Sequence, residues 1–403
     1  MSTALKKPDE GHTPSAPPSS KPNGRSTKPK NSLTAGQKPG WTWMVVAAAS
    51  LAVGAGLIAL IASEGFSFAG WLILSAIVYV IGMYVTTRVI ENKRRATDGL
   101  WRNLVWAAFI VALIPLVSLL WTVFAQGLPT LLSNPGLLTE DMSTTNGATD
   151  AATQDEGAPL SGGFVHGLIG TLMITVVATV ISVPIGLMAS IYLVEYSRGG
   201  WFARTITFFV DVMTGIPSIV AGLFAFAAVQ LFITTFLGES PVYLQMVKMG
   251  LSAAIALSVL MIPVVVRSTE EMLRVVPNEL REASYALGVR KWKTIMKVVL
   301  PTSISGIASG VTLAIARVTG ETAPILVTAG FLATTNWNPF SGWMTALPVY
   351  IYRQLVNPTA PAAPVPSEMR AWAAALVLII IVMLLNLVAR IVAQAFAPKK
   401  TGR

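Results

Sequence analysis

Long apolar runs recur along the whole chain and restrict it to one kind of fold. Each run is about twenty residues long, which is enough for a helix to cross a hydrocarbon core of roughly 30 Å. The runs are continuously apolar and lack the two-residue alternation of membrane β-barrels. With 53% hydrophobic and 12% charged residues, the chain carries about half the charge of a typical soluble protein. These features predict an all-α, polytopic membrane protein.

Eight of these runs are predicted to span the membrane. The predicted spans are residues 41–62, 68–85, 104–125, 164–194, 206–236, 250–266, 302–331 and 371–395. Residues 1–40 are rich in Pro, Ser, Lys and Gly, so we expect a disordered cytosolic tail. The chain is therefore divided into this tail, an N-terminal helix pair at 41–90 and a main membrane domain at 91–403.

The basic residues predict the orientation. Placing both termini in the cytosol puts 24 of the 29 Lys and Arg residues on the cytosolic side, as basic residues beside membrane spans require. The loop that follows the third span contains five acidic residues and no Lys or Arg. The net charge of +10 is thus better explained by membrane orientation than by a nucleic-acid partner.

Several kinds of chemistry lack their residues. The chain has no Cys and only two His, His12 and His166, so we predict no metal site and no bound cofactor. No segment reads GxxxxGK[ST], the loop that holds nucleotide phosphates. The chain is therefore not expected to be an enzyme or to hydrolyse ATP.

Proline and glycine interrupt three of the spans. Pro184 and Pro217 lie inside the fourth and fifth, where proline removes a backbone hydrogen bond and can kink a helix. Such a break either lines a cavity or is simply tolerated. Gly306 and Gly310 in the seventh span have the GxxxG spacing, which predicts close approach of a neighbouring helix.

The segment at 268–301 is too polar for the membrane and should form two short cytosolic helices. We expect Asn278 to cap the first helix and Gly288 to end it in a left-handed conformation. One face would carry Leu280, Ala283, Ser284 and Leu287. That face suits the groove of another protein. The basic residues that follow equally suit a helix at the lipid headgroups, and the pattern leaves both open.

Two charged residues in the seventh span are costly there. An arginine at the middle of a membrane helix costs roughly 2.5–3.5 kcal/mol, so Arg317 should face protein or a wet pathway. Glu321 is four residues further and is expected on the same helical face. The two are either a buried packing pair or part of an anion pathway, because a guanidinium binds phosphate well. Arg267 serves membrane anchoring or the pathway. Asp211 either extends toward the membrane surface or pairs with a neighbouring arginine.

One motif in the polar segment resembles a known family. Glu282-Ala283-Ser284, three residues, Gly288, nine residues and then Val298-Val299-Leu300-Pro301 match the EAA loop of ABC-importer permeases. Ser284 replaces the second alanine of the motif, and Val298 replaces an isoleucine. The resemblance implies that this loop docks onto an ATPase subunit, with Glu282, Ala283, Ser284, Gly288, Leu300 and Pro301 as coupling residues.

Further segments resemble the PstA family of phosphate-specific permease subunits. They are residues 167–172, 191–196, 215–224, 316–324 and, more weakly, 344–348. The resemblance covers about 100–396 and implies the type I ABC-importer permease core of six helices, to which this chain adds two at its N-terminus. It also implies a transport role for Arg317; Glu321 falls in the same motif, and Arg267 matches a basic position of the family.

The resemblance further implies partners and an energy source. A PstC-like second permease subunit, a PstB-like ATPase dimer using ATP and Mg, and a PstS-like extracytoplasmic phosphate-binding protein would assemble with this chain in the bacterial inner membrane. The expected function is one half of a phosphate pathway driven by the partner's ATP hydrolysis. Two alternatives are a permease for another oxyanion and an ATP-independent secondary transporter.

Overall fold

A computed structural model describes residues 38–61, 67–197 and 199–395 of the chain. The predicted tail therefore lies almost wholly outside the described residues. The chain divides into two compact units, one up to Pro115 and one from Leu116 onward. Each unit is described by itself.

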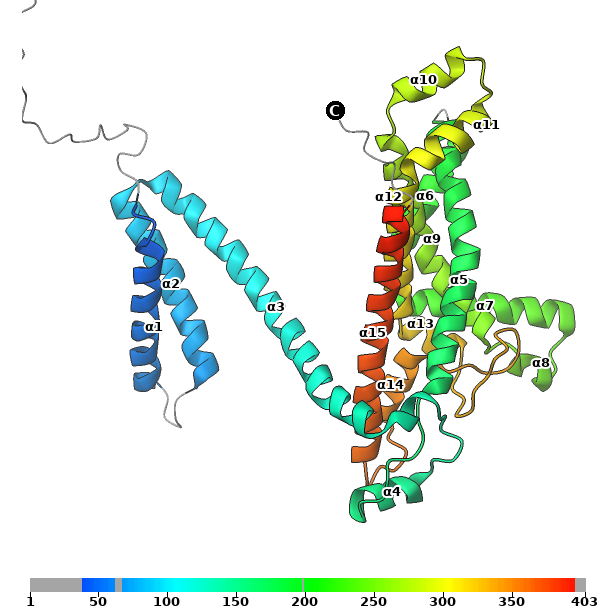
Figure 1. Ribbon diagram of the computed structural model, residues 1–403, viewed down its shortest axis with the longest axis horizontal. Helices are drawn as coiled ribbons and strands as arrows, with labels where there is room; N and C mark the ends of the chain where they lie inside the picture. The colour runs from blue at the N-terminus through cyan, green and yellow to red at the C-terminus, as the bar shows by residue number, and fades with distance from the viewer. Residues whose placement is uncertain (1–37, 62–66, 198, 396–403) are drawn as a thin grey trace, which may run out of the picture. The chain divides into compact units, whose positions relative to one another are not determined.

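The first unit is built on a helical hairpin. Its helices are α1 (Thr42–Ile61), α2 (Phe68–Ile90) and the beginning of α3 (Lys93–Ser133), as Figure 1 shows. A Cβ atom at Gly54 would lie 2.1 Å from Ser75 Oγ, so only glycine allows α1 and α2 this close. At the other end of the pair, Lys38 Nζ donates to Thr87 Oγ1 at 3.0 Å and its backbone N donates to Glu91 at 3.0 Å. The two helices thus pack closely at Gly54, and hydrogen bonds from Lys38 connect the chain just before α1 to the end of α2.

The second unit holds the rest of α3 and all later helices. In chain order they are η1 (Pro135–Leu138), α4 (Gly147–Asp155), α5 (Val165–Ile191), the π-helical turn η2 (Tyr192–Tyr196), α6 (Trp201–Gly215), α7 (Ser218–Leu237), α8 (Pro241–Gln245), α9 (Gly250–Val275), α10 (Asn278–Ala286), α11 (Lys291–Thr294), the π-helical turn η3 (Ile295–Val299), α12 (Leu300–Thr319), α13 (Ala323–Thr328), α14 (Leu347–Val356) and α15 (Val365–Ala395). The described residues contain no strand. The all-α prediction is confirmed.

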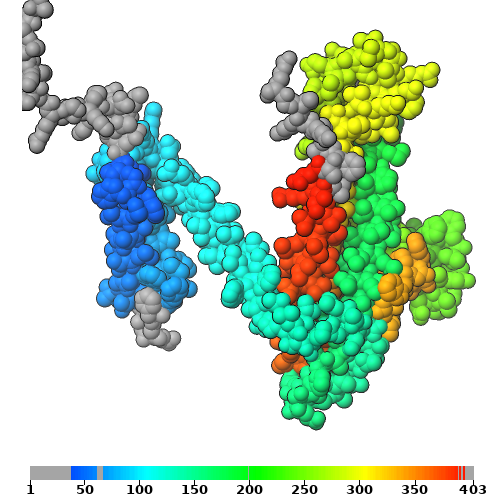
Figure 2. Space-filling view, viewed as in Figure 1, coloured from blue at the N-terminus to red at the C-terminus, as the bar shows by residue number. Residues whose placement is uncertain are grey.

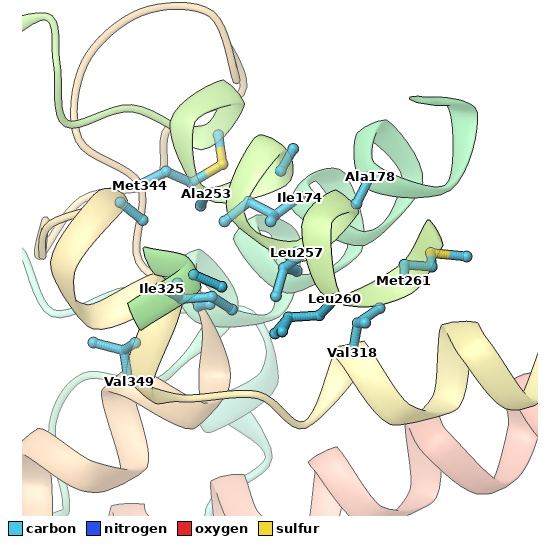
Figure 3. Close-up of a cluster of buried hydrophobic side chains, with 14 of the residues drawn as sticks. Ile174, Ala178, Ala253, Leu257, Leu260, Met261, Val318, Ile325, Met344 and Val349 are labelled. Atoms are coloured by element: carbon cyan, nitrogen blue, oxygen red, sulfur yellow. The ribbon is translucent and has the colours of Figure 1, made fainter. Parts of the chain in front are cut away.

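Helix α9 is the centre of the second unit, and α5, α7, α12 and α13 pack around it. Leu257 and Met261 of α9 are fully buried, with Ile174, Val318 and Ile325 among their neighbours in the same apolar cluster (Figure 3). Lipid is as apolar as these side chains, so close packing rather than escape from water must hold such helices together.

Small residues make this packing possible. A Cβ atom at Gly186 of α5 would lie 2.6 Å from Val265 of α9, and one at Gly310 of α12 would lie 2.3 Å from Ser268. Gly306 meets Met272 in the same way. The predicted close approach at Gly306 and Gly310 is confirmed, and α9 is the neighbour.

Eight helices of the described residues are long and apolar enough to cross a membrane, which confirms the predicted number. Pro184 stays inside α5 without ending it. The polar connector before the third predicted span is also helical, so α3 runs for 41 residues from Lys93.

The fifth predicted span, 206–236, is wrong as one helix. Residues 201–215 form α6, and α7 begins only at Ser218. Pro217 lies between them with ψ 138°, because proline lacks the N–H that would continue the helical ladder. Of the two, α7 alone meets the length and hydropathy of a span.

The seventh predicted span, 302–331, is too long at its end. Helix α12 stops at Thr319, and the short helix α13 follows after a break at Gly320. Pro324 occupies the first turn of α13, where its missing N–H costs nothing.

Different helices form the two ends of the second unit. Helices α10 and α11 form one end, while α4 and the segments around it form the opposite end (Figure 1). In the space-filling view, α10 and α11 project beyond the ends of the neighbouring helices (Figure 2). Residues 276–301, which contain α10, α11 and η3 and which we call the coupling segment, are therefore presented at the surface.

Candidate functional site

The coupling segment leaves α9 after Val275 and returns to the helix bundle at α12 through α10, α11 and η3. Gly288 has φ +72°, so the predicted left-handed turn after α10 is confirmed. The predicted N-cap is one residue off, because Pro277 precedes the helix and Asn278 is its first residue. Pro277 supplies a preset φ and no capping side chain.

The residues of the predicted small face do not share one environment. Ser284 is buried, and its hydroxyl lies 2.8 Å from the hydroxyl of Thr294 in α11. Leu280 and Leu287 are exposed, as are Ala283 and Glu282. The serine that replaces an alanine of the motif thus braces α10 against α11, while its neighbours stay free for a partner.

Exposed apolar side chains gather on the coupling segment. They are Leu280, Tyr285, Leu287, Trp292 and Met296, with Leu287 83% exposed. Leu300 instead packs into a small cluster with Val299 and Ile307, and Pro301 occupies the first turn of α12. The segment therefore has an outer face open to contact and an inner face fixed to the helix bundle.

Arg317 and Glu321 are not arranged as predicted. Arg317 lies in the last turn of α12, whereas Glu321 follows the helix end at Gly320, so the two do not share a helical face. Among the described residues, no ion pair joins them, and Arg317 is exposed. A cation at a helix C-terminus is stabilised by about 0.3–1 kcal/mol by the helix dipole, which offsets part of its cost there.

Arg267 lies between two carboxylates. Its guanidinium donates to Asp211 of α6 and to Glu270 of α9, the latter at 2.8 Å. The Glu270 side chain is 6% exposed and that of Asp211 is 60% exposed. Arg267 thus joins α6 to α9, and the pairing considered for Asp211 is confirmed.

Segments that match the family separately in the sequence meet in pairs in the structure. Gly222 of α7 faces α13, where an added Cβ would lie 2.6 Å from Pro324 Cα. Gly170 of α5 faces the 344–348 segment, where a Cβ would lie 2.0 Å from the carbonyl oxygen of Thr345. Next to it, Thr171 Oγ1 accepts the backbone N–H of Leu347 at 2.7 Å. The glycines of these segments are close-approach positions.

Sequence reasoning missed a buried ion pair at the end of the unit that carries α4. Arg370 donates to both carboxylate oxygens of Asp150, at 2.9 and 2.5 Å, and both side chains are fully buried. Arg370 also donates to the carbonyl of Ser161 at 3.0 Å. An arginine near the start of a span and an acidic loop without basic residues were the available signs of such a pair.

Asp141 likewise connects segments that are far apart in the sequence. It accepts hydrogen bonds from Ser143 and from the backbone N–H and hydroxyl of Thr335. The hydroxyl of Ser143 is the main cause that keeps the pKa of this carboxyl below its usual value. A lowered pKa means that the stabilisation is present at neutral pH and is lost only as pH falls through that lowered pKa.

A second missed group lies beneath the coupling segment. Arg281 of α10 holds the Glu195 carboxylate with Nε at 3.0 Å and Nη2 at 2.8 Å. It also donates to the carbonyls of Leu273 and Val276 at the end of α9. Lys291 of α11 donates to the backbone carbonyl of Glu195. We call Glu195, Arg281 and Lys291 the α5 junction.

The described residues contain no group of three or more His, Asp or Glu that could hold a metal ion. His166, the only histidine among them, is buried against the rings of Tyr350 and Phe331. Both rings lie nearly perpendicular to its imidazole, with centroid distances of 5.3 Å for Tyr350 and 6.4 Å for Phe331.

Comparison with protein families gives one match. Residues 182–402 match the family described as binding-protein-dependent transport system inner membrane component. The match contains α9, the coupling segment, α12 and α15.

Named relatives are similar over most of the chain. Phosphate transport system permease protein PstA 1 of Mycobacterium tuberculosis is 44% identical over 308 residues, which cover 76% of this chain and 92% of that protein. The PstA protein of Mycobacterium leprae is 42% identical over 310 residues, covering 75% and 90%. That of Yersinia pestis is 40% identical over 242 residues, covering 59% and 74%.

Solved structures are similar over part of the fold. An inward-facing MetNI methionine ABC transporter has a TM-score of 0.44 at 22% identity and covers 58% of this chain and 96% of that one. A bacterial alginate ABC transporter also has a TM-score of 0.44, at 14% identity, and covers 75% and 99%. The family assignment rests on the sequence matches.

Proposed function

The chain belongs to the family of binding-protein-dependent transport system inner membrane components, and we propose that it is the phosphate-importer permease among them. The observation that carries the proposal is the 44% identity to a phosphate transport system permease along 92% of that protein. Similarity along nearly a whole relative is expected when the pathway, and not only the fold, is shared. The eight apolar helices of the described residues are those of a multi-pass membrane protein, as a permease requires.

The energy for transport comes from a partner in this proposal. The chain has no phosphate-binding GxxxxGK[ST] loop. An ATPase dimer that uses ATP and Mg would supply the work. The exposed side chains of α10 and its C-cap, such as Leu280 and Leu287, would enter a groove of that dimer. Burial of exposed apolar area contributes most of the favourable free energy of protein–protein association.

The remaining partners complete the pathway. A second, related permease subunit would pair with this chain, and an extracytoplasmic binding protein would deliver phosphate to the two. We assign the N-terminus and C-terminus to the cytosol of a bacterial cell with this complex in its inner membrane, because the basic residues favour that orientation.

Arg317 is the residue that we assign to the anion. Its exposed guanidinium can present two parallel N–H groups to phosphate oxygens, and its charge is permanent. Glu321 lies beyond the helix end, where it can weaken phosphate binding electrostatically without occupying the guanidinium. Such weakening favours release, because a site that holds its substrate too tightly cannot transport it.

Arg267 would act nearer the cytosol. Gly310 of α12 is level with Ser268 of α9, so Arg267 lies about seven residues, or roughly 10 Å, from Arg317 along the helix pair. Asp211 and Glu270 already bind its guanidinium. A phosphate passing there would compete with the exposed Asp211 and would not be held as strongly as by a free arginine.

The transport cycle follows from these parts. ATP-driven closure of the ATPase dimer would move α10, and the attached α9 and α12 would change the side to which the pathway opens. Phosphate would leave its binding protein, pass Arg317 and reach the cytosol in the next opening.

Radiolabelled phosphate uptake tests the proposal. In a strain whose own copy of the gene is deleted, the restored chain should return phosphate uptake that excess sulfate does not inhibit. Uptake of sulfate instead of phosphate would identify a permease for another oxyanion. Phosphate uptake that persists after ATP hydrolysis by the complex is abolished would identify a secondary transporter. Either result contradicts the proposed function.

A further inference from the structure

The α5 junction connects α10 to a helix that does not directly follow or precede the coupling segment in the chain. Helix α10 is joined by the chain itself to α9 on one side and, through α11, to α12 on the other. Helix α5 has no such covalent connection to the coupling segment. Its end nevertheless carries Glu195, which receives the side chains of both Arg281 and Lys291.

We propose that the Glu195–Arg281 ion pair makes α5 a third arm of the coupling mechanism. It would transmit displacement of α10 directly to α5. Arg281 and Glu195 are positioning residues in this proposal, and neither contacts phosphate. The inference rests on the proposed function, since it concerns how a partner ATPase moves this chain.

The geometry of the pair suits a rigid connection. Both guanidinium nitrogens that face Glu195 reach the same carboxylate oxygen, at 3.0 and 2.8 Å. The side chains are 13% and 5% exposed, so water screens their attraction little. The other guanidinium donors hold the carbonyls of Leu273 and Val276, which the end of α9 leaves without helical partners. One side chain therefore joins α10, α9 and α5.

The end of α5 is shaped to present Glu195. Residues 192–196 form a π-helical turn, which closes with the N–H of Ser197 bonded to the carbonyl of Tyr192 at 2.8 Å. A π-helical turn inserts one residue into a helix and redirects the side chains that follow, and such turns concentrate at functional positions. Lys291 then binds the freed carbonyl of Glu195 and lies 5.0 Å from the ring centre of Tyr196.

Apolar packing continues the connection into the bundle. Leu187, Ile191 and Val194 of α5 and η2 pack against a cluster that contains Leu273, Val276 and Val299. Above this level α5 and α9 pack along most of their length. Displacement of the α5 end would thus reach Gly170 and Thr171, which lie in the same helix.

The inward and outward residues of α10 should have different roles in coupling. Leu280 and Leu287 are exposed on the outer side, while Arg281 and Ser284 are turned inward to η2 and α11. Loss of an outward residue should release the ATPase. Loss of the inward ion pair should leave the ATPase bound and reduce the amount of phosphate imported per ATP hydrolysed.

The number of ATP molecules hydrolysed per phosphate imported measures that difference. In proteoliposomes with the complete transporter, we expect Glu195→Gln to raise this number at least threefold while the ATPase still co-purifies. Glu271→Gln is the matched control, because Glu271 is exposed near the same end of α9 and forms no ion pair within the described residues; it should leave the number unchanged. An unchanged number for Glu195→Gln would overturn the proposal, and so would loss of the ATPase from the complex.

A double variant tests whether the two residues act as one unit. Arg281→Gln should raise the number at least as much as Glu195→Gln, since it also releases the end of α9. Combining both changes should be no worse than Arg281→Gln alone. Effects that multiply would show that the residues act independently and would contradict the proposal.

A distance measurement separates this inference from the proposed function. The chain has no Cys, so spin labels can be attached at Met188→Cys on α5 and Glu279→Cys on α10 without other reactive thiols in it. With the ion pair intact, we expect one narrow distance distribution throughout the ATP cycle, and Glu195→Gln should broaden it. A distribution that Glu195→Gln leaves narrow overturns the inference even if phosphate is transported. Absent phosphate uptake by the wild type contradicts the proposed function instead.

Discussion

The arginines of the second unit differ in what satisfies their charge. Arg370 is fully buried with Asp150, and Arg281 is largely buried with Glu195 and two carbonyls. Arg267 is shared by two carboxylates, and its side chain is 38% exposed. Arg317 is exposed and forms no ion pair with any described residue. Of these four arginines, Arg317 is the one that has no carboxylate partner among the described residues and is best able to accept an external anion.

Replacement of Arg317 tests this assignment. Arg317→Gln should reduce phosphate uptake at least tenfold, because the amide keeps hydrogen-bonding capacity but lacks the charge and the fork. Complex assembly should persist, since the side chain is exposed and braces no other helix. Arg274→Gln, an exposed change on α9, is the control and should retain uptake. Normal uptake by Arg317→Gln would exclude Arg317 from the pathway.

Replacement of Arg370 should act on stability instead. Arg370→Met leaves Asp150 buried without its cation, which costs about 3–5 kcal/mol in comparable buried pairs. The melting temperature of the purified complex should fall clearly. Asp155→Asn on the exposed side of the same helix α4 should change stability by less than about 0.5 kcal/mol. Equal melting temperatures for the two variants would show that the pair contributes little.

Among the elements, the coupling segment depends most on its turns. Helix α10 has nine residues and is too short to be stable alone, so contacts at its ends determine its position. Gly288 sets the direction of the chain after α10, and the Ser284–Thr294 contact holds the two short helices together.

A substitution at Gly288 should therefore affect coupling. The left-handed conformation costs a residue with a Cβ roughly 1–2 kcal/mol, so Gly288→Ala should displace α11 relative to α10. We expect less ATPase to co-purify with the complex and phosphate uptake to fall in proportion. Gly99→Ala is the control, because that glycine has open space around it in α3. Full ATPase retention in Gly288→Ala would show that this turn does not position the docking helix.

Sequence reasoning predicted the elements better than their junctions. Apolar runs identified all eight spans because a helix in lipid needs only length and hydropathy. They did not separate α6 from α7, since residues on both sides of Pro217 are apolar, and they did not end α12 at Thr319. Proline alone did not predict the break, because Pro217 separates α6 from α7 whereas Pro184 is tolerated inside α5.

At the scale of the whole molecule, the sequence predicted only those parts of the candidate site that are encoded locally. A single motif indicated the coupling segment, because its turn at Gly288 is encoded locally. The Arg281–Glu195 and Arg370–Asp150 pairs join residues 86 and 220 positions apart, and no local pattern specifies which residues pair. The N-terminal hairpin α1–α2 belongs to a separate unit and lies outside the family match.

The central claim is that this chain forms a phosphate pathway whose movement is powered by ATP hydrolysis in a partner. Its most direct test is phosphate accumulation in proteoliposomes that contain the chain with its permease, ATPase and binding-protein partners. With ATP and Mg, labelled phosphate should accumulate against its gradient, and a non-hydrolysable ATP analogue should stop accumulation. Equal accumulation with ATP and with the analogue would contradict the claim.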